Sequence, residues 1–170
     1  MITNILWILS QMAFYASGMA VAFNGNVLYT YGGMRYPWAE SSMMSGPNVS
    51  HDTRINRAYV KGWIDNGHFY TLGGRDNFVP KATFYRTNLN SFNTEQLAPM
   101  ATPRISYCMA NFDNPKITIV VGGYNPQPHL PSSHNVQTQL QSVEYYHHGT
   151  NRWIPLDPFP VPVTHCSAAV

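Results

Sequence analysis

The sequence of 170 residues contains little charge. Asp, Glu, Lys and Arg make up 11% of it, and the net charge is only +2. The basic residues form no run that would neutralise a row of phosphates, so a nucleic acid is not expected as a partner. Because 44% of the residues are hydrophobic and 14% aromatic, a disordered tail and a charged coiled coil are excluded as well. We expect one compact unit with a buried core.

Cysteine is also scarce. Cys108 and Cys166 are the two cysteines, and neither lies in a Cys-x-x-Cys pair or in a zinc-binding spacing. The seven histidines share no chelating spacing either, so no metal and no other cofactor is expected. These counts leave the compartment open, with the cytoplasm favoured over secretion.

Long hydrophobic runs are absent. None approaches the roughly 18 apolar residues of a transmembrane helix, so no membrane span is predicted. The apolar residues 5–9, followed by small residues at 16–18, share features with a secretory signal peptide. They lack a preceding basic stretch, and Ser10 and Gln11 end the run after five residues, so cleavage is not expected.

Helical periodicity is missing, whereas signals for strands recur. The chain contains 13 Pro and 12 Gly, and short runs rich in Val, Ile, Tyr, Phe and Thr lie between turn residues, which predicts an all-β protein. Three runs end in a Gly pair, at Gly32-Gly33, Gly73-Gly74 and Gly122-Gly123. Each pair begins seven or eight residues after the start of a turn dipeptide, Asn-Gly in two cases, which favours a tight hairpin.

Two further strands are predicted after each of the later Gly pairs. Tyr146 precedes Trp153 by seven residues, and Tyr85 precedes Phe92 by the same distance. This spacing predicts a repeated unit of four strands with an aromatic residue on the outermost strand. Such a ring can cover the gap to a neighbouring sheet while its polar atom binds a backbone group.

The repeated unit resembles the kelch repeat, most closely in residues 55–160. Arg104, Gly122-Gly123, Tyr146, Trp153 and Pro158-Phe159-Pro160 stand where that repeat has its Arg, Gly pair, Tyr, Trp and turn. Gly73 and Gly122 are 49 residues apart, near the kelch period of about 50. The resemblance implies a β-propeller, in which four-stranded sheets, or blades, pack face to face around an axis. An antiparallel sandwich with unrelated Gly pairs is the alternative.

The resemblance divides the chain into parts of a propeller. Residues 3–12 are expected as the outer strand of a preceding blade, 13–54 as a degenerate blade with shortened or rearranged outer strands, 55–100 and 101–160 as two blades, and 161–170 as the first strand of a following blade. Because propellers close with roughly four to eight blades, we expect a segment of a larger protein or of a multi-chain assembly. An intact domain with frayed ends is the alternative.

The loops after the Gly pairs are the predicted partner-binding residues, because loops on a rigid frame carry most binding functions and Arg, Tyr and Trp dominate interfaces. The candidates are Arg35, Tyr36, Trp38, Arg75, Asp76, Phe78, Tyr124, Asn125 and His129. The alternative is that these loops are solvated and that their aromatic rings pack on their own blade.

Two arginines and the two cysteines have structural interpretations. Arg57 and Arg104 begin inner strands, where they either line a channel or, as we favour, pair with backbone carbonyls. Cys108 and Cys166 are expected at equivalent positions on adjacent blades. Because packed sheets lie about 10 Å apart, we expect these cysteines beyond the reach of a disulfide, as small apolar residues.

The sequence therefore predicts a protein-interaction scaffold on a kelch-like propeller, with other protein chains as partners. It contains no recognisable carboxylate pair, nucleophile elbow or phosphate-binding loop. The resemblance also allows a fragment of a kelch-type enzyme, such as a sugar epimerase or a copper-radical oxidase. The oxidase would require a Tyr and a Cys near two His, and the neighbours Tyr107 and Cys108 suggest such a pair.

Overall fold

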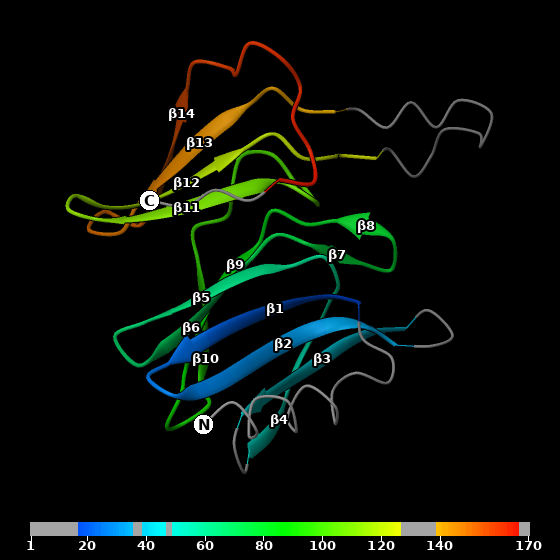
Figure 1. The fold of residues 1–170 in the computed structure, drawn as a ribbon, viewed down its shortest axis with the longest axis vertical. Helices are drawn as coiled ribbons and strands as arrows, with labels where there is room; N and C mark the ends of the chain where they lie inside the picture. Colours follow the sequence, from blue (N-terminus) through cyan, green and yellow to red (C-terminus); the bar gives the residue numbers. More distant parts are fainter. Residues whose placement is uncertain (1–16, 36–38, 47–48, 127–138, 167–170) are drawn as a thin grey trace. The chain divides into compact units, whose positions relative to one another are not determined.

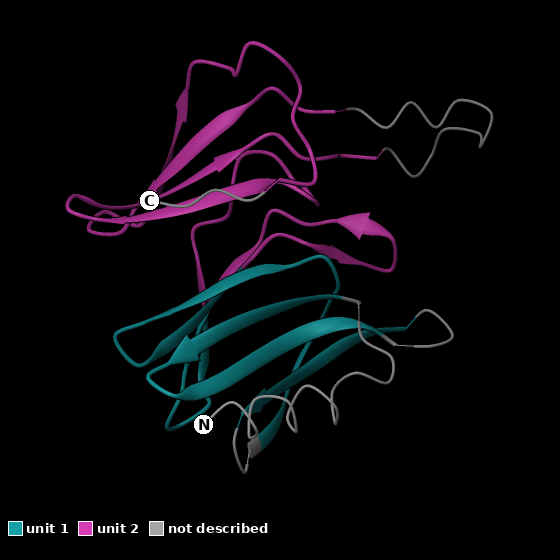
Figure 2. Cartoon of the chain, in the orientation of Figure 1, with its two compact units in different colours: residues 1–71, 86–95 teal, residues 72–85, 96–170 magenta. Residues whose placement is uncertain are grey.

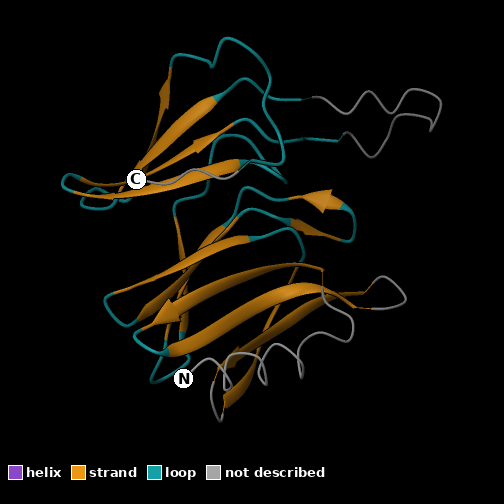
Figure 3. Cartoon of the chain, viewed as in Figure 1, coloured by secondary structure: helices purple, strands orange, loops and turns teal. Residues whose placement is uncertain are grey.

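The computed structural model of the chain describes residues 17–35, 39–46, 49–126 and 139–166 (Figure 1). Within these ranges the chain forms β-strands and no helix (Figure 3). The all-β prediction is therefore confirmed, and so is the prediction of four-stranded antiparallel sheets.

Three four-stranded sheets follow one another along the chain, and in each the strands lie in chain order. The first contains β1 (Ser17–Asn24), β2 (Val27–Arg35), β3 (Ala39–Gly46) and β4 (Val49–Arg57). The second contains β5 (Lys61–Asp65), β6 (His68–Leu72), β9 (Phe84–Asn88) and β10 (Thr94–Leu97). The third contains β11 (Cys108–Asp113), β12 (Lys116–Val121), β13 (Val143–His147) and β14 (Arg152–Leu156). A small hairpin of β7 (Arg75–Asp76) and β8 (Val79–Pro80) lies between β6 and β9 in the sequence.

The chain divides into two compact units (Figure 2). Unit 1 contains residues 1–71 and 86–95, and unit 2 contains residues 72–85 and 96–170. Strands β6, β9 and β10 contribute residues to both.

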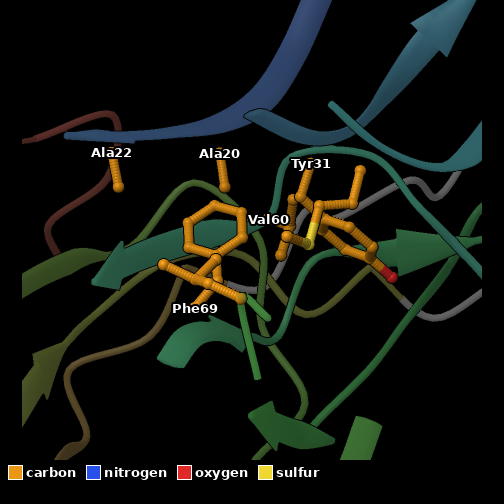
Figure 4. Close-up of a cluster of buried hydrophobic side chains, with 7 residues drawn as sticks. Ala20, Ala22, Tyr31, Val60 and Phe69 are labelled. Carbon is orange, nitrogen blue, oxygen red and sulfur yellow. The ribbon is translucent and has the colours of Figure 1, made fainter. Parts of the chain in front are cut away.

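The core of unit 1 lies between the first and second sheets. Ala20 and Ala22 of β1 pack with the fully buried Phe69 of β6 (Figure 4). The Tyr31 ring meets Phe69 edge to face, with ring centroids 6.4 Å apart. A Cβ on Gly62 of β5 would lie 2.9 Å from the Cβ of Ala20. Small residues on β1 and β5 thus allow the sheets to approach, and one large ring fills the space between them.

Unit 2 contains the corresponding interface between the second and third sheets. The buried Phe84 of β9 packs edge to face against Tyr146 and Trp153, at centroid distances of 4.8 and 6.0 Å. The indole nitrogen of Trp153 donates a hydrogen bond of 2.8 Å to the Ala98 carbonyl. The role predicted for an outer-strand aromatic residue is confirmed at Trp153.

The second and third repeats share one pattern of backbone hydrogen bonds. Five bonds of the second repeat have counterparts in the third, where residues carry numbers higher by 49 up to the Gly pair and by 59 after the following loop. The matched bonds are Gly73 N–Thr83 O with Gly122 N–Ser142 O, Gly74 N–Arg104 O with Gly123 N–Val163 O, Lys81 N–Gly74 O with Leu140 N–Gly123 O, Leu89 N–Gly67 O with His148 N–Lys116 O, and Met100 N–Ala82 O with Phe159 N–Gln141 O. The internal repeat is therefore present in the backbone as well as in the sequence.

The first glycine of each Gly pair has the same kind of neighbour in all three repeats. A Cβ on Gly32, Gly73 or Gly122 would meet the carbonyl oxygen of Arg57, Arg104 or Val163, respectively. Two residues after each of these carbonyls, Tyr59, Ser106 and His165 have φ angles of 55°, 53° and 51°. Residues 57–60, 104–107 and 163–166 are named the entry segments, because the first two lead into β5 and β11.

These bonds correct the register predicted for the outer strands. The offset of 59 residues aligns Phe92 with Asn151, and both have positive φ angles, 58° and 50°. Thr94 therefore stands at the position of Trp153, and Thr87 at that of Tyr146. The hydroxyls of Thr87 and Thr94 lie 2.9 Å apart. The prediction that Tyr85 and Phe92 occupy the Tyr and Trp positions was wrong. Their seven-residue spacing equals that of Tyr146 and Trp153, but it aligns the repeats at an offset of 61 residues instead of 59.

The first sheet departs from the other two. Strand β2 continues through Gly32-Gly33, and its pairing with β3 shifts register between Tyr31 and Met34. Strands β3 and β4 contain eight and nine residues, so the outer strands are irregular rather than shortened. Residues 3–12 lie outside the described part of the chain, as do residues 167–170, and residues 161–166 form no strand.

We predict that Gly122→Ala destabilises the protein more than Gly25→Ala. Both glycines have positive φ, 64° and 60°, so the two substitutions share a backbone cost of about 1 kcal/mol. A Cβ at position 25 would meet nothing within 4 Å, whereas one at position 122 would collide with the Val163 carbonyl. We expect a further loss of about 1–3 kcal/mol for Gly122→Ala in urea unfolding. Equal losses would contradict the close approach.

Candidate interaction site

A buried arginine lies where the third repeat begins. Arg104 is completely buried, and its guanidinium donates to the carbonyl oxygens of Gly122 (2.7 Å) and Ser142 (3.2 Å). It also donates to the Ser142 hydroxyl (3.0 Å). The favoured interpretation of Arg104, pairing with backbone carbonyls, is confirmed.

Glu144 of β13 is the charged partner of this arginine, and sequence reasoning missed it. Its Oε1 accepts from Nη2 of Arg104 at 2.5 Å, and its carboxylate accepts from the backbone N–H groups of Ala101 (2.7 Å) and Thr102 (3.3 Å). Burial lowers the pKa of Arg104, and Glu144 opposes that shift. The signal was a lone acidic residue in a run of apolar and aromatic ones, because such a charge is rarely buried without a partner.

Both backbone polar groups of Ala98 bind side chains of the third repeat. The side-chain oxygen of Asn151 accepts from the Ala98 N–H (2.9 Å) and from the Tyr146 hydroxyl (2.7 Å), while Trp153 binds the Ala98 carbonyl. Together with Arg104 and Glu144, these contacts fix the segment that follows β10. They are structural contacts, and they provide unit 2 with a rigid frame for its loops.

The loop after the second Gly pair forms the β7–β8 hairpin and carries three candidate residues. The Arg75 guanidinium lies 4.6 Å from the centre of the Phe78 ring, and Lys81 Nζ lies 3.9 Å from the Asp76 carboxylate. Phe78 is 57% exposed and has a φ angle of 64°. Because a bulky residue in the left-handed region is strained, this turn holds a large apolar ring in solvent at a conformational cost.

The other candidates fall into two groups. Tyr124 is tied to the third repeat, since its N–H and carbonyl both bond to Ile105 and its ring lies 5.3 Å from that of His165. Asn125 follows it and is half-buried. Tyr36, Trp38 and His129 lie outside the described residues, and for Arg35 the structure describes the backbone alone.

The face of the third sheet that carries Cys108 is named the outer face. Cross-strand pairing places Cys108 with Val121, Ala110 with Ile119, and Phe112 with Ile117, so these six residues share that face. On the opposite face, Thr118 and Val120 are completely buried, whereas Ile117, Ile119 and Val121 are only half-buried. An interior strand with β-branched apolar residues on both faces is typical of a sheet covered on both sides.

A disulfide joins Cys108 to Cys166, with their Cα atoms 5.0 Å apart. The prediction that these cysteines lie out of reach was wrong. It placed them at equivalent positions on adjacent blades, whereas the repeat register aligns Cys166 with Tyr107. In addition, the His165 N–H donates to the Ser106 carbonyl at 2.8 Å, which holds the last entry segment beside β11.

The residues suggested for a copper-radical oxidase are engaged in structural contacts. The Tyr107 hydroxyl is buried and donates to the Leu72 carbonyl at 2.6 Å, and Cys108 is in the disulfide. Among the described residues, no group of three His, Cys, Asp or Glu side chains could hold a metal ion. In the same part of the chain, no helix has the length and apolar character to span a membrane. No known protein family and no curated protein matches the chain.

We predict that Glu144→Gln costs about 3–5 kcal/mol in chemical unfolding, because it leaves the Arg104 charge buried without its counter-charge. The matched control is Glu95→Gln, which removes an exposed partner of Arg86. We expect the control to change stability by less than about 1 kcal/mol. Similar losses for the two variants would contradict a tightly coupled buried pair.

Proposed function

We propose that the chain is a kelch-like β-propeller segment that acts as a protein-interaction scaffold. The repeated backbone bonds, the glycine-to-carbonyl approach in each repeat, and the Arg104, Tyr146 and Trp153 positions support the kelch assignment. The sheet-on-sheet packing within each unit is consistent with blades that pack face to face.

One observation supports the scaffold function. The second and third repeats share the same backbone hydrogen bonds, whereas the loops that these bonds enclose differ in length. Matched backbone bonds fix both ends of the loop after the second and third Gly pairs, but Gly73 and Thr83 are 10 positions apart whereas Gly122 and Ser142 are 20 positions apart. In the shorter loop, the guanidinium of the half-buried Arg75 lies against the exposed ring of Phe78. A rigid frame with variable loops suits recognition of protein partners.

The outer face of the third sheet supports the propeller part of the proposal. Leu156 on the edge strand β14 is 45% exposed, and Ile117, Ile119 and Val121 of β12 are half-buried on the same face. The Val163 carbonyl accepts from Gly123 as the Arg104 carbonyl accepts from Gly74, and His165 shares the positive φ of Ser106, whose segment leads into a four-stranded sheet. We propose that a further four-stranded sheet of the same kind, entered through residues 163–166, covers this face.

The loop prediction is tested by photo-crosslinking. Benzoylphenylalanine at position 78 is expected to capture a discrete protein partner, whereas the same residue at Glu95, an exposed position on β10, is expected to capture none. Arg75→Ala with Phe78→Ala should weaken binding of that partner at least about tenfold, since hot-spot side chains of these types contribute about 2 kcal/mol or more. Equal capture at positions 78 and 95, or unchanged affinity of the double variant, would argue against the hairpin.

The covered-face prediction is tested by association of the 170-residue chain. We expect the isolated chain to bind a hydrophobic dye and to self-associate in light scattering through the uncovered face. Ile117→Thr with Ile119→Thr should abolish both effects at small cost in stability. Val120→Thr, on the buried face, should instead lower the unfolding midpoint. A monomeric chain that binds no dye would show that the face needs no cover.

A further inference from the structure

The disulfide lies at the junction between the third repeat and the last entry segment. Cys108 shares the outer face with Ala110 and Phe112, so its bond to Cys166 places the end of residues 163–166 over that face. The bond closes a chain segment with a sequence separation of 58 residues, which contains the whole third sheet. Cross-links that close long segments strongly restrict the unfolded chain.

Among the described residues, hydrogen bonds and the Tyr124–His165 ring contact also hold this entry segment. Two backbone bonds of 2.8 Å, Gly123 N–H to Val163 O and His165 N–H to Ser106 O, attach it to the sheet. A third contact, from the Thr164 hydroxyl to the Tyr124 hydroxyl, is long at 3.4 Å. Gly122 leaves space for the segment, because a Cβ at this position would collide with Val163. The disulfide is therefore the covalent part of an attachment that otherwise depends on these noncovalent contacts.

We infer that the Cys108–Cys166 disulfide is a redox-sensitive lock that fastens residues 163–166 to the third sheet, and that the protein matures in an oxidising compartment. Structural disulfides persist in secreted and extracytoplasmic proteins, whereas cytosolic thiols are kept reduced. The inference replaces the expectation that favoured the cytoplasm. It does not depend on ring closure, because the lock lies within the described chain.

The lock forms by thiol–disulfide exchange with a disulfide donor. One cysteine thiolate attacks a donor sulfur, which forms a mixed disulfide and releases one donor thiolate. The second cysteine thiolate then attacks the sulfur of the first, which closes the Cys108–Cys166 bond and releases the second donor sulfur. The two cysteines lose two electrons and two protons, and the donor gains them. A dithiol reductant reverses both steps.

Thiol counting in the unmodified chain tests the bond itself. Protein isolated from the cells that make it, quenched in acid and alkylated with iodoacetamide under denaturing conditions, is expected to carry no alkyl group before reduction and two after it. Two alkyl groups before reduction would overturn both the lock and the oxidising compartment.

Hydrogen exchange tests the mechanical role of the bond. Addition of a phosphine reductant is expected to speed exchange of the Gly123 and His165 amides at least about tenfold, because local opening becomes less costly. The Ala101 amide, which bonds to Glu144, serves as the internal control and should change by less than about twofold. Cys108→Ser with Cys166→Ser should reproduce the fast exchange and abolish the response to reductant.

The reductant experiment on the wild-type chain tests the redox-sensitive lock even if the double variant does not fold. Unchanged exchange at Gly123 and His165 after complete reduction would overturn the lock. Equal acceleration at Ala101 would also overturn it, because the effect would then be general loosening of unit 2. Neither result bears on partner binding by the β7–β8 hairpin, so failure here is distinguishable from failure of the proposed scaffold function.

Discussion

The close approach between a glycine and a carbonyl is the constraint on which the repeated architecture depends. In each repeat the first glycine of a pair lies against the carbonyl oxygen of residue 57, 104 or 163. Any side chain at the glycine would separate the sheet from the following entry segment. The second glycine of the later pairs then donates its N–H to the same carbonyl, at 3.2 Å for Gly74 and 2.8 Å for Gly123. The Gly pair thus serves both steric fit and hydrogen bonding.

The buried ion pair adds orientation to this backbone contact. Arg104 supplies the carbonyl that faces Gly73, while its side chain reaches Gly122, Ser142 and Glu144 of the next repeat. Desolvation of both charges is costly, and Glu144 offsets it because it also accepts two backbone N–H groups. Hydrogen bonds of this kind are directional, so they specify one arrangement of the entry segment where apolar packing alone would allow several.

The repeat was predictable from the sequence because turn dipeptides and Gly pairs act locally. Asn66-Gly67 forms the predicted hairpin with φ angles of 45° and 70°, and β5 and β6 lie on either side of it. The outer-strand register was not predictable from the Tyr85–Phe92 spacing, because loops of different length shift the two halves of a repeat by different amounts. The Arg104–Glu144 pair and the disulfide each join residues at least 40 positions apart, so no local pattern shows which two residues pair. For the candidate site, the sequence predicted that the loop containing Arg75 and Phe78 binds a partner. The strained turn and the cation–π contact in this loop were found only in the structure.

These constraints explain why some residues hold the sheets together while the loops differ between repeats. The frame depends on the buried Arg104–Glu144 pair, on the glycines that face carbonyl oxygens, and on packed aromatic rings such as Phe84 and Tyr146. The loop after a Gly pair begins and ends at fixed bonds, so its length and composition can change without altering those contacts, as the loops of the second and third repeats do. At the outer face, the disulfide adds a covalent bond to the two backbone hydrogen bonds that attach residues 163–166 within the described part of the chain. A protein built in this way can present variable loops from a frame whose last described junction responds to redox conditions.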